Sequence, residues 1–373
     1  MYTTGTVPLI NSLIARISGS TEGSISFRDY MEACLYHESW GYYMSDSPKL
    51  GREGDYYTSS FVGSLMGEMT ACALSPYLVS LPDEQIMIVE WGGGSGRLAK
   101  QMLDTWEEKF PEIYERIRYV SIEKSPAHRR LQYEALARHA SKIEHLTSGQ
   151  WIQGGPYRSV AVISNEVPDA FPVYRYIYEG TGWREIRVGW SEDSGKFIEI
   201  YEGKPVPEHE CYLSAYLPSP AVGQKAEVNM DAITWMKEIG QAVESGYVLT
   251  LDYGHEAEEL YAAHRREGTL LCYYQHQASS DPFIRVGEQD MTAHVNFSAC
   301  IDAGEQAGLE LVSLKTQKEF LVEAGILGEL QEHAVQDPFS PAARRNRGIR
   351  QLLLSDQMSE LFKVMLQSKG VKR

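Results

Sequence analysis

The 373-residue sequence lacks several features that mark secreted, metal-binding or membrane proteins. Its five cysteines, at positions 34, 72, 211, 272 and 300, are odd in number and never form a C-x-x-C pair. This pattern argues against a disulfide framework or a zinc site and for a reducing compartment. No apolar run approaches the roughly 18 residues of a membrane span, and no signal peptide is evident at the N-terminus. We therefore expect a cytoplasmic protein with neither a membrane anchor nor a bound metal.

Basic residues are also scarce. The chain has 35 lysine and arginine residues against 51 aspartate and glutamate residues, which gives a formal net charge of −16. Nonspecific nucleic-acid binding needs a basic surface that displaces counterions from phosphates, so the charge disfavours a nucleic-acid partner. It is compatible with a basic protein substrate, although many enzymes are acidic for solubility alone.

What the chain does contain is a glycine-rich turn between a strand pattern and a helix pattern. Residues 86–90 predict a buried strand, glycines follow at 92, 93, 94 and 96, and apolar residues at helical spacing begin at Leu98. Such a turn presents bare backbone N–H groups at a helix N-terminus, which is how α/β folds bind nucleotide-like cofactors. The alternative is a structural turn with no ligand.

Two cofactor classes fit this turn, and the end of the strand distinguishes them. Residues 94–99 match the dinucleotide pattern G-x-G-x-x-A, whereas residues 90–96 match the acid-x-G-x-G-x-G loop of S-adenosylmethionine (SAM) methyltransferases. Because the strand ends near Glu90, a dinucleotide loop at Gly94 would begin too far downstream. The next strand ends in Glu123, which suits two ribose hydroxyls. We expect SAM to be bound by Glu90, Gly92, Gly94, Gly96 and Glu123.

Alternating strand and helix patterns predict an α/β fold with a Rossmann-like, doubly wound sheet. We expect the SAM-binding core to comprise residues 81–172 and 229–316. Period-two alternation around Trp183 and Phe197 predicts an antiparallel β insertion over 173–228. Its aromatic residues suit a partner or substrate surface. A helical region with a Gly-Asp loop (1–80) is expected before the core, and a helical segment (317–373) after it.

Polar side chains follow another predicted strand, Val160–Ser164. Asn165, Glu166 and Asp169 come after it, at the carboxyl edge where doubly wound folds place reacting groups. Two carboxylates suit a guanidinium, because they bind its planar fork and favour loss of a proton in the transition state. We expect Glu166 and Asp169 to grip the substrate and Asn165 to contact the cofactor. The alternative is that Asp169 caps a helix and Glu166 faces solvent.

Several sequence blocks, in one order, resemble the methyltransferase family of the mitochondrial complex I assembly factor and its bacterial relatives. They include Gly54-Asp-Tyr-Tyr-Thr-Ser59, the glycine loop, residues 165–172, Asp252-Tyr-Gly254 and residues 290–297. The resemblance implies a class I SAM-dependent fold and, for the mitochondrial member, dimethylation of an arginine in a complex I subunit. It also suggests that Asp55 lies over the cofactor or at the target entrance, and the alternative is an Asx-type turn that satisfies its own backbone. The chain departs from the family pattern at Gly93, where a proline is usual.

These observations predict a SAM-dependent methyltransferase that modifies an arginine side chain of a protein. Two other classes stay open. One is an assembly chaperone that retains a non-catalytic SAM site, and the other is a nicotinamide-dependent oxidoreductase that uses the G-x-G-x-x-A match. Intact acids and glycines in the loop argue against decay of the cofactor site, but they do not establish turnover.

Overall fold

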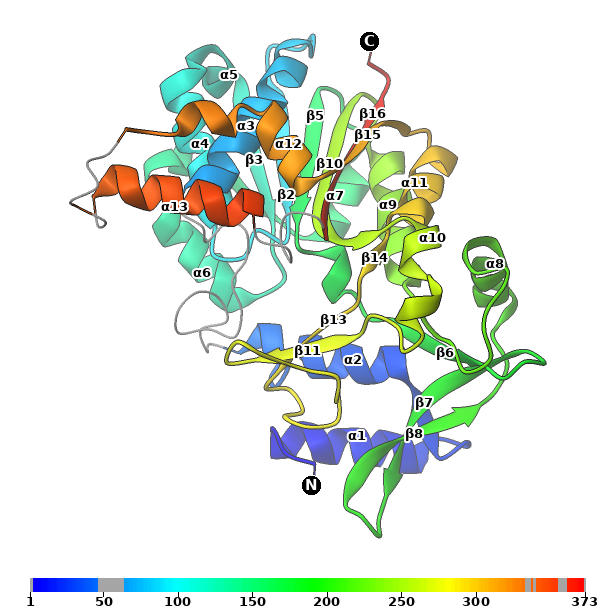
Figure 1. Cartoon of the computed structure of the whole chain (residues 1–373). Coiled ribbons are helices and arrows are strands. Elements are labelled where there is room, and N and C mark those ends of the chain that lie inside the picture. Colours follow the sequence, from blue (N-terminus) through cyan, green and yellow to red (C-terminus); the bar gives the residue numbers. More distant parts are fainter. Residues whose placement is uncertain (1–2, 46–63, 333–336, 338–339, 355–360, 372–373) are drawn as a thin grey trace. The chain divides into compact units, whose positions relative to one another are not determined.

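The computed structural model describes residues 3–45, 64–332, 337, 340–354 and 361–371 (Figure 1). The chain forms two compact units, and each is built from three separate stretches of sequence. The first unit contains Met1–Tyr57, Pro168–Trp235 and Gly254–Cys300, and the second contains Thr58–Val167, Met236–Tyr253 and Ile301–Arg373.

The second unit is built around a sheet with the strand order β15-β16-β10-β5-β2-β3-β4. The five strands from β10 to β4 are parallel, and β16 runs antiparallel to both of its neighbours. This arrangement confirms the predicted doubly wound, mostly parallel sheet. The strands are β2 (Ile86–Trp91), β3 (Ile117–Ile122), β4 (Ile143–Leu146), β5 (Val160–Asn165), β10 (Gly246–His255), β15 (Glu310–Thr316) and β16 (Phe362–Lys369).

The central strands are buried on both faces. The first five residues of β5 and the first seven of β10 are buried, as is typical of parallel strands covered by helices. One hydrophobic core joins α3 and α4 to β2, β3, β5 and β10. The helices of this unit are α3 (Leu65–Val79), α4 (Arg97–Lys109), α5 (Pro111–Arg116), α6 (Pro126–Ala135), α7 (Ser148–Gly154), α12 (Gln317–Glu323) and α13 (Pro341–Leu354), with the ends of α9 (Met230–Ala242) and α11 (Phe297–Gln306).

The prediction of a helical C-terminal segment over 317–373 was wrong at its end. Helices α12 and α13 occur as expected, but residues 362–369 form β16, which lies between β10 and β15. A short apolar run is compatible with a helix or a strand when it is considered alone. Here residues 362–369 form a strand, because the backbone N–H and C=O groups of β10 and β15 that face them need hydrogen-bond partners.

The first unit contains an antiparallel sheet of β1 (Ser24–Ser26), β6 (Tyr174–Tyr178), β7 (Trp183–Ser191), β8 (Lys196–Glu202) and β9 (Lys225–Val228). This confirms the predicted antiparallel strands. A second sheet contains β11 (Leu271–Tyr274), β12 (Gln277–Ser279) and β13 (Asp290–Thr292), and β14 (Val295–Asn296) pairs with the end of β10. The helices are α1 (Val7–Gly19), α2 (Phe27–Tyr36), α8 (Pro207–Tyr216), α10 (Ala257–Leu260) and the start of α9.

The unit boundaries differ from the predicted ones, because the N-terminal helices and the insertion share one core. Phe27 and Tyr30 of α2 pack with Val188 of β7 and Phe197 of β8 in a single hydrophobic cluster. The region 1–57 therefore joins residues 168–235 and 254–300 in one unit. Among the helices that the structure describes, none is both long enough and apolar enough to cross a membrane.

Candidate active site

The glycine loop and the turn that bears Glu166 meet at one point of the second unit. From β2 the chain continues to β3 and β4 on one side, whereas β5 lies on the other side of β2 (Figure 1). Doubly wound sheets bind ligands at such a switch point, at the carboxyl ends of the strands. The two loops touch there, because a Cβ added at Gly92 would lie 2.6 Å from Cγ2 of Val167.

Three glycines of the loop have left-handed backbone conformations. Gly92, Gly94 and Gly96 have φ angles of +70°, +52° and +77°, which residues other than glycine rarely adopt. Gly96 is also the N-cap of α4, so the first N–H groups of this helix face the loop. The backbone thus requires glycine at the predicted positions, and their contact with the cofactor stays a prediction.

Glu90 lies beneath the loop and is only 2% exposed. Its Oε2 has no hydrogen-bond partner among the described residues. Burial raises the pKa of Glu90 to about 8, and the charge of Glu123 contributes to the rise. A Cβ at Gly93 would lie 2.6 Å from this oxygen, so glycine replaces the usual proline where the carboxylate comes close.

Glu123 fixes the other side of the loop. Its Oε2 accepts a hydrogen bond from the backbone N–H of Gly94 at 2.8 Å, and its Oε1 accepts one from the N–H of Ser125 at 2.7 Å. Each carboxylate oxygen retains a second lone pair, which can accept a ribose hydroxyl. A buried acid beside a loop of glycines, whose backbone a ligand can approach closely, fits a cationic, ribose-bearing ligand such as SAM.

Glu166 stands directly after β5 in a strained conformation. Its φ is +55°, which is uncommon for a residue other than glycine and clusters at functional sites. Its N–H donates to the carbonyl oxygen of Leu251 at 2.9 Å. Nδ2 of Asn165 donates to Oε1 of Glu166 at 3.2 Å. Asn165 thus contacts the carboxylate that we expect to bind substrate.

The role of Asp252 was not found from the sequence. This residue is fully buried in β10, where its Oδ2 accepts from the N–H of Val167 at 3.2 Å and its Oδ1 from the N–H of Tyr253 at 2.7 Å. It therefore ties the turn that bears Glu166 to the end of β10. The available indication was its position, because it follows an apolar run as Glu90 and Asn165 do.

Two predicted residues, Asp169 and Asp55, remain to be described. Asp169 belongs to the first unit and lies within η4 (Pro168–Ala170). It is 5% exposed, and its carbonyl oxygen accepts from the N–H of Ala293 at 2.9 Å. Asp55 lies outside the described residues. The predicted joint grip of Glu166 and Asp169 therefore stays a prediction.

Comparisons with known proteins identify the family of this chain. A family model of S-adenosyl-L-methionine-dependent methyltransferases matches residues 74–314. The chain belongs to this family. It is also similar to a Burkholderia thailandensis protein crystallised with S-adenosyl-homocysteine, at 29% identity and a TM-score of 0.88, over 98% of this chain and 93% of that one. These findings confirm the class I fold and SAM as the cofactor.

Animal relatives are similar over most of their length. The Danio rerio protein arginine methyltransferase NDUFAF7, mitochondrial, is 24% identical over 363 residues, which cover 91% of this chain and 82% of the relative. The Drosophila melanogaster homologue is 26% identical over 315 residues, which cover 77% of this chain and 68% of the relative. The methyltransferase resembles both at low identity.

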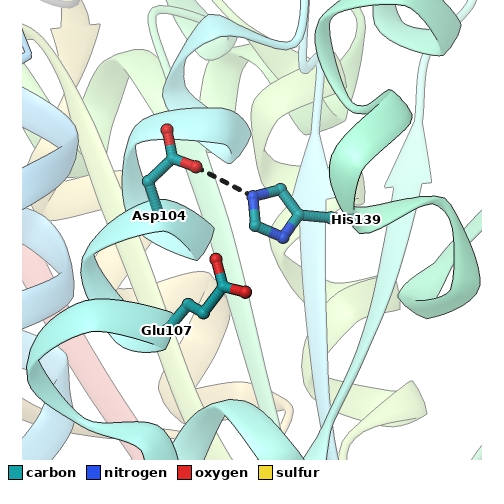
Figure 2. A group of neighbouring side chains, drawn as sticks. All are labelled: Asp104, Glu107 and His139. Atoms are coloured by element: carbon teal, nitrogen blue, oxygen red, sulfur yellow. Dashed lines mark hydrogen bonds and ion pairs between the residues drawn. The ribbon is translucent and has the colours of Figure 1, made fainter.

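Among the residues that the structure describes, one group of neighbouring side chains has the ligand types of a metal site, as Figure 2 shows. Ligand atoms of Asp104 and Glu107 on α4 and of His139 lie within 4.8 Å of one another. These side chains already form hydrogen bonds and ion pairs with one another and with neighbouring residues. His139 contacts Oδ1 of Asp104 at 3.0 Å and the hydroxyl of Tyr114 at 2.7 Å, and Glu107 pairs with Arg138 at 2.8 Å. We assign no ligand to this group.

Proposed function

We propose that this methyltransferase modifies an arginine side chain of a protein substrate. The observation that carries the proposal is Glu166, a carboxylate in left-handed backbone at the carboxyl end of β5. The turn that bears it touches the glycine loop through Val167. Strain of this kind is a cost that active sites retain because it aims a functional side chain. The names of the animal relatives support the same substrate class.

Methylation of an arginine requires a carboxylate next to the guanidinium. An arginine guanidinium has a pKa above roughly 12 and lacks a nucleophilic lone pair until a proton leaves. SAM supplies the methyl group on a cationic sulfur when it is bound. Glu166 would accept N–H bonds of the guanidinium, orient one nitrogen and favour departure of its proton. Asn165 would orient Glu166, and Asp169 and Asp55 would add further contacts to the substrate.

The distribution of charge supports a basic partner. The stretches of the first unit contain 25 acidic and 13 basic residues, a formal charge of −12, whereas those of the second unit contain 26 and 22, a charge of −4. A surface with this excess attracts a basic protein and speeds its encounter. We propose that the first unit, which carries the predicted insertion, docks the substrate protein.

The substrate can be identified with methyl-labelled SAM. Incubation with a cell lysate, followed by mass spectrometry of the labelled protein, should place the methyl group on arginine. A methyl group on lysine, on glutamine or on a small molecule would contradict the arginine assignment, while the methyltransferase itself would stand.

The role of Glu166 has its own test. Glu166→Gln should preserve SAM affinity and lower methyl transfer on the order of 10²–10³-fold, the usual effect of losing a charge-assisted contact made in the transition state. Glu144→Gln is the matched control, because Glu144 is a surface carboxylate on β4 that pairs with Arg118. Unchanged turnover in Glu166→Gln would remove Glu166 from the mechanism.

Docking by the insertion is tested at the turn between β7 and β8. Shortening residues 192–195 should preserve SAM binding and weaken methylation of the protein substrate only. Trp190 packs on Phe197 with ring centroids 5.1 Å apart, and Trp183 packs on Tyr178 at 5.3 Å, so these aromatic residues also support the sheet. The turn is the better site for the test, because its change leaves those contacts in place.

A further inference from the structure

We infer that Gln132 is a positioning residue that holds the glycine loop in its cofactor-binding shape. Gln132 lies on α6 and is fully buried. Its Nε2 donates a hydrogen bond to the carbonyl oxygen of Gly94 at 2.9 Å. A buried amide far along the sequence thus contacts the loop at its central glycine.

The other end of the side chain fixes which way the amide points. Oε1 of Gln132 accepts from the hydroxyl of Ser121 on β3 at 2.7 Å and lies 3.0 Å from Nε2 of His145 on β4. Oε1 can only accept a hydrogen bond, so the ring of His145 donates to it from Nε2 in this arrangement. Two donors at Oε1 leave the NH₂ group facing the loop.

Gly94 is consequently held at both of its backbone polar groups. Its N–H donates to Glu123 at 2.8 Å, and its C=O accepts from Gln132 at 2.9 Å. Both hydrogen-bond partners are side chains, not the backbone of a neighbouring strand. They hold Gly94 at a φ of +52°. A loop fixed in this way does not have to be ordered by the ligand, which lowers the entropic cost of binding.

Gln132 also packs under the neighbouring glycines. A Cβ at Gly96 would lie 3.1 Å from Cγ of Gln132, and a Cβ at Gly93 would lie 3.0 Å from its Nε2. The glutamine therefore contacts three of the four loop glycines, Gly94 through a hydrogen bond and the other two through packing. The glycine motif and Gln132 form one structure, although 38 residues separate Gly94 from Gln132 in sequence.

The experiment measures the affinity for S-adenosyl-homocysteine by calorimetry on the full chain. Gln132→Met removes the contact with Gly94 and should weaken binding roughly 3- to 10-fold, the usual effect of one hydrogen bond. Gln224→Met is the matched control, because Gln224 is a buried glutamine of the first unit that donates to Tyr261 and accepts from Ala221. Both variants should lower the melting temperature, but only Gln132→Met should lower affinity.

Two more variants separate positioning from simple support of the core. Gln132→Glu retains the shape and the acceptor for Ser121, but its carboxylate has no N–H for Gly94, so binding should fall as in Gln132→Met. Ser121→Ala removes the hydroxyl on the far side and leaves the Gly94 contact, so affinity should stay within about twofold of wild type. Wild-type affinity in Gln132→Met and Gln132→Glu would overturn the inference, and so would an equal loss in Gln224→Met.

Discussion

The backbone N–H of Val167 donates a hydrogen bond to Oδ2 of Asp252 at 3.2 Å. The preceding residue, Glu166, donates its own N–H to the carbonyl oxygen of Leu251 at 2.9 Å. Two consecutive residues of β10 thus bind two consecutive residues of the turn after β5. This pairing imposes the left-handed backbone of Glu166, and it links the proposed substrate-binding acid to the rigid centre of the sheet.

Asp252→Asn should loosen that link. An amide has one acceptor oxygen, so its NH₂ group would face the N–H of either Val167 or Tyr253, which leaves a buried donor without an acceptor. We expect a loss of roughly 1–3 kcal/mol in the free energy of unfolding and a fall in methyl transfer that exceeds any change in SAM affinity. Urea unfolding and labelled-SAM assays measure the two effects.

The control for this change is Asp83→Asn. Asp83 accepts from the hydroxyl of Ser159 at 2.8 Å and does not contact the turn. If Asp83→Asn lowered methyl transfer as strongly as Asp252→Asn, a specific role of Asp252 would be excluded.

Glu166→Gly should have opposite effects on stability and activity. Glycine adopts a φ of +55° at no steric cost, so relief of strain should raise stability by up to about 1 kcal/mol. Methyl transfer should be lost, because the carboxylate is gone. Thermal unfolding and the labelled-SAM assay test both outcomes. A destabilised variant would show that the side chain, rather than the backbone strain, dominates the energetics of this turn.

The buried carboxyl of Glu90 should make stability depend on pH. Its pKa is about 8 in the folded chain against an ordinary value of 4.5, so the folded state retains a proton that the unfolded state has lost. The contribution of Glu90 to stability therefore falls as pH rises from about 4.5 to 8. Glu90→Gln cannot ionise and should gain stability relative to wild type across this window, by up to a few kcal/mol.

Urea unfolding at pH 5.5 and pH 8.5 measures this difference, since groups common to both proteins cancel. Bound SAM is cationic and should favour the ionised form of Glu90, so its binding near pH 7 should release protons in wild type and fewer in Glu90→Gln. Calorimetry in buffers of different ionisation enthalpy counts these protons. A stability difference that stays constant with pH would contradict the assignment.

The loop glycines should differ sharply from a surface glycine. Gly92→Ala combines a φ of +70° with a Cβ 2.6 Å from Val167, and we expect it to lower stability by about 1–3 kcal/mol and to weaken SAM binding. Gly149 in α7 has no neighbour within 4 Å of an added Cβ. Gly149→Ala should raise stability by roughly 0.5–1 kcal/mol. Similar effects of the two changes in thermal unfolding would contradict this account.

The sequence by itself predicted β2, β5, the glycine loop and the doubly wound sheet. These features are local, because an apolar run forms a buried strand and a positive φ admits few residues besides glycine. The three glycines with positive φ could therefore be predicted from their spacing. The antiparallel strands of the insertion were readable for the same reason, since period-two alternation is a local pattern.

Only the tertiary structure decided which distant groups complete the site. No pattern around Gln132 indicates that its amide reaches Gly94, because that contact depends on how α6 packs against the loop. The strand β16 and the union of residues 1–57 with the insertion have the same origin. Residues 362–369 form a strand because it satisfies backbone hydrogen bonds of β10 and β15, and the N-terminal helices join the insertion because their apolar faces bury one another.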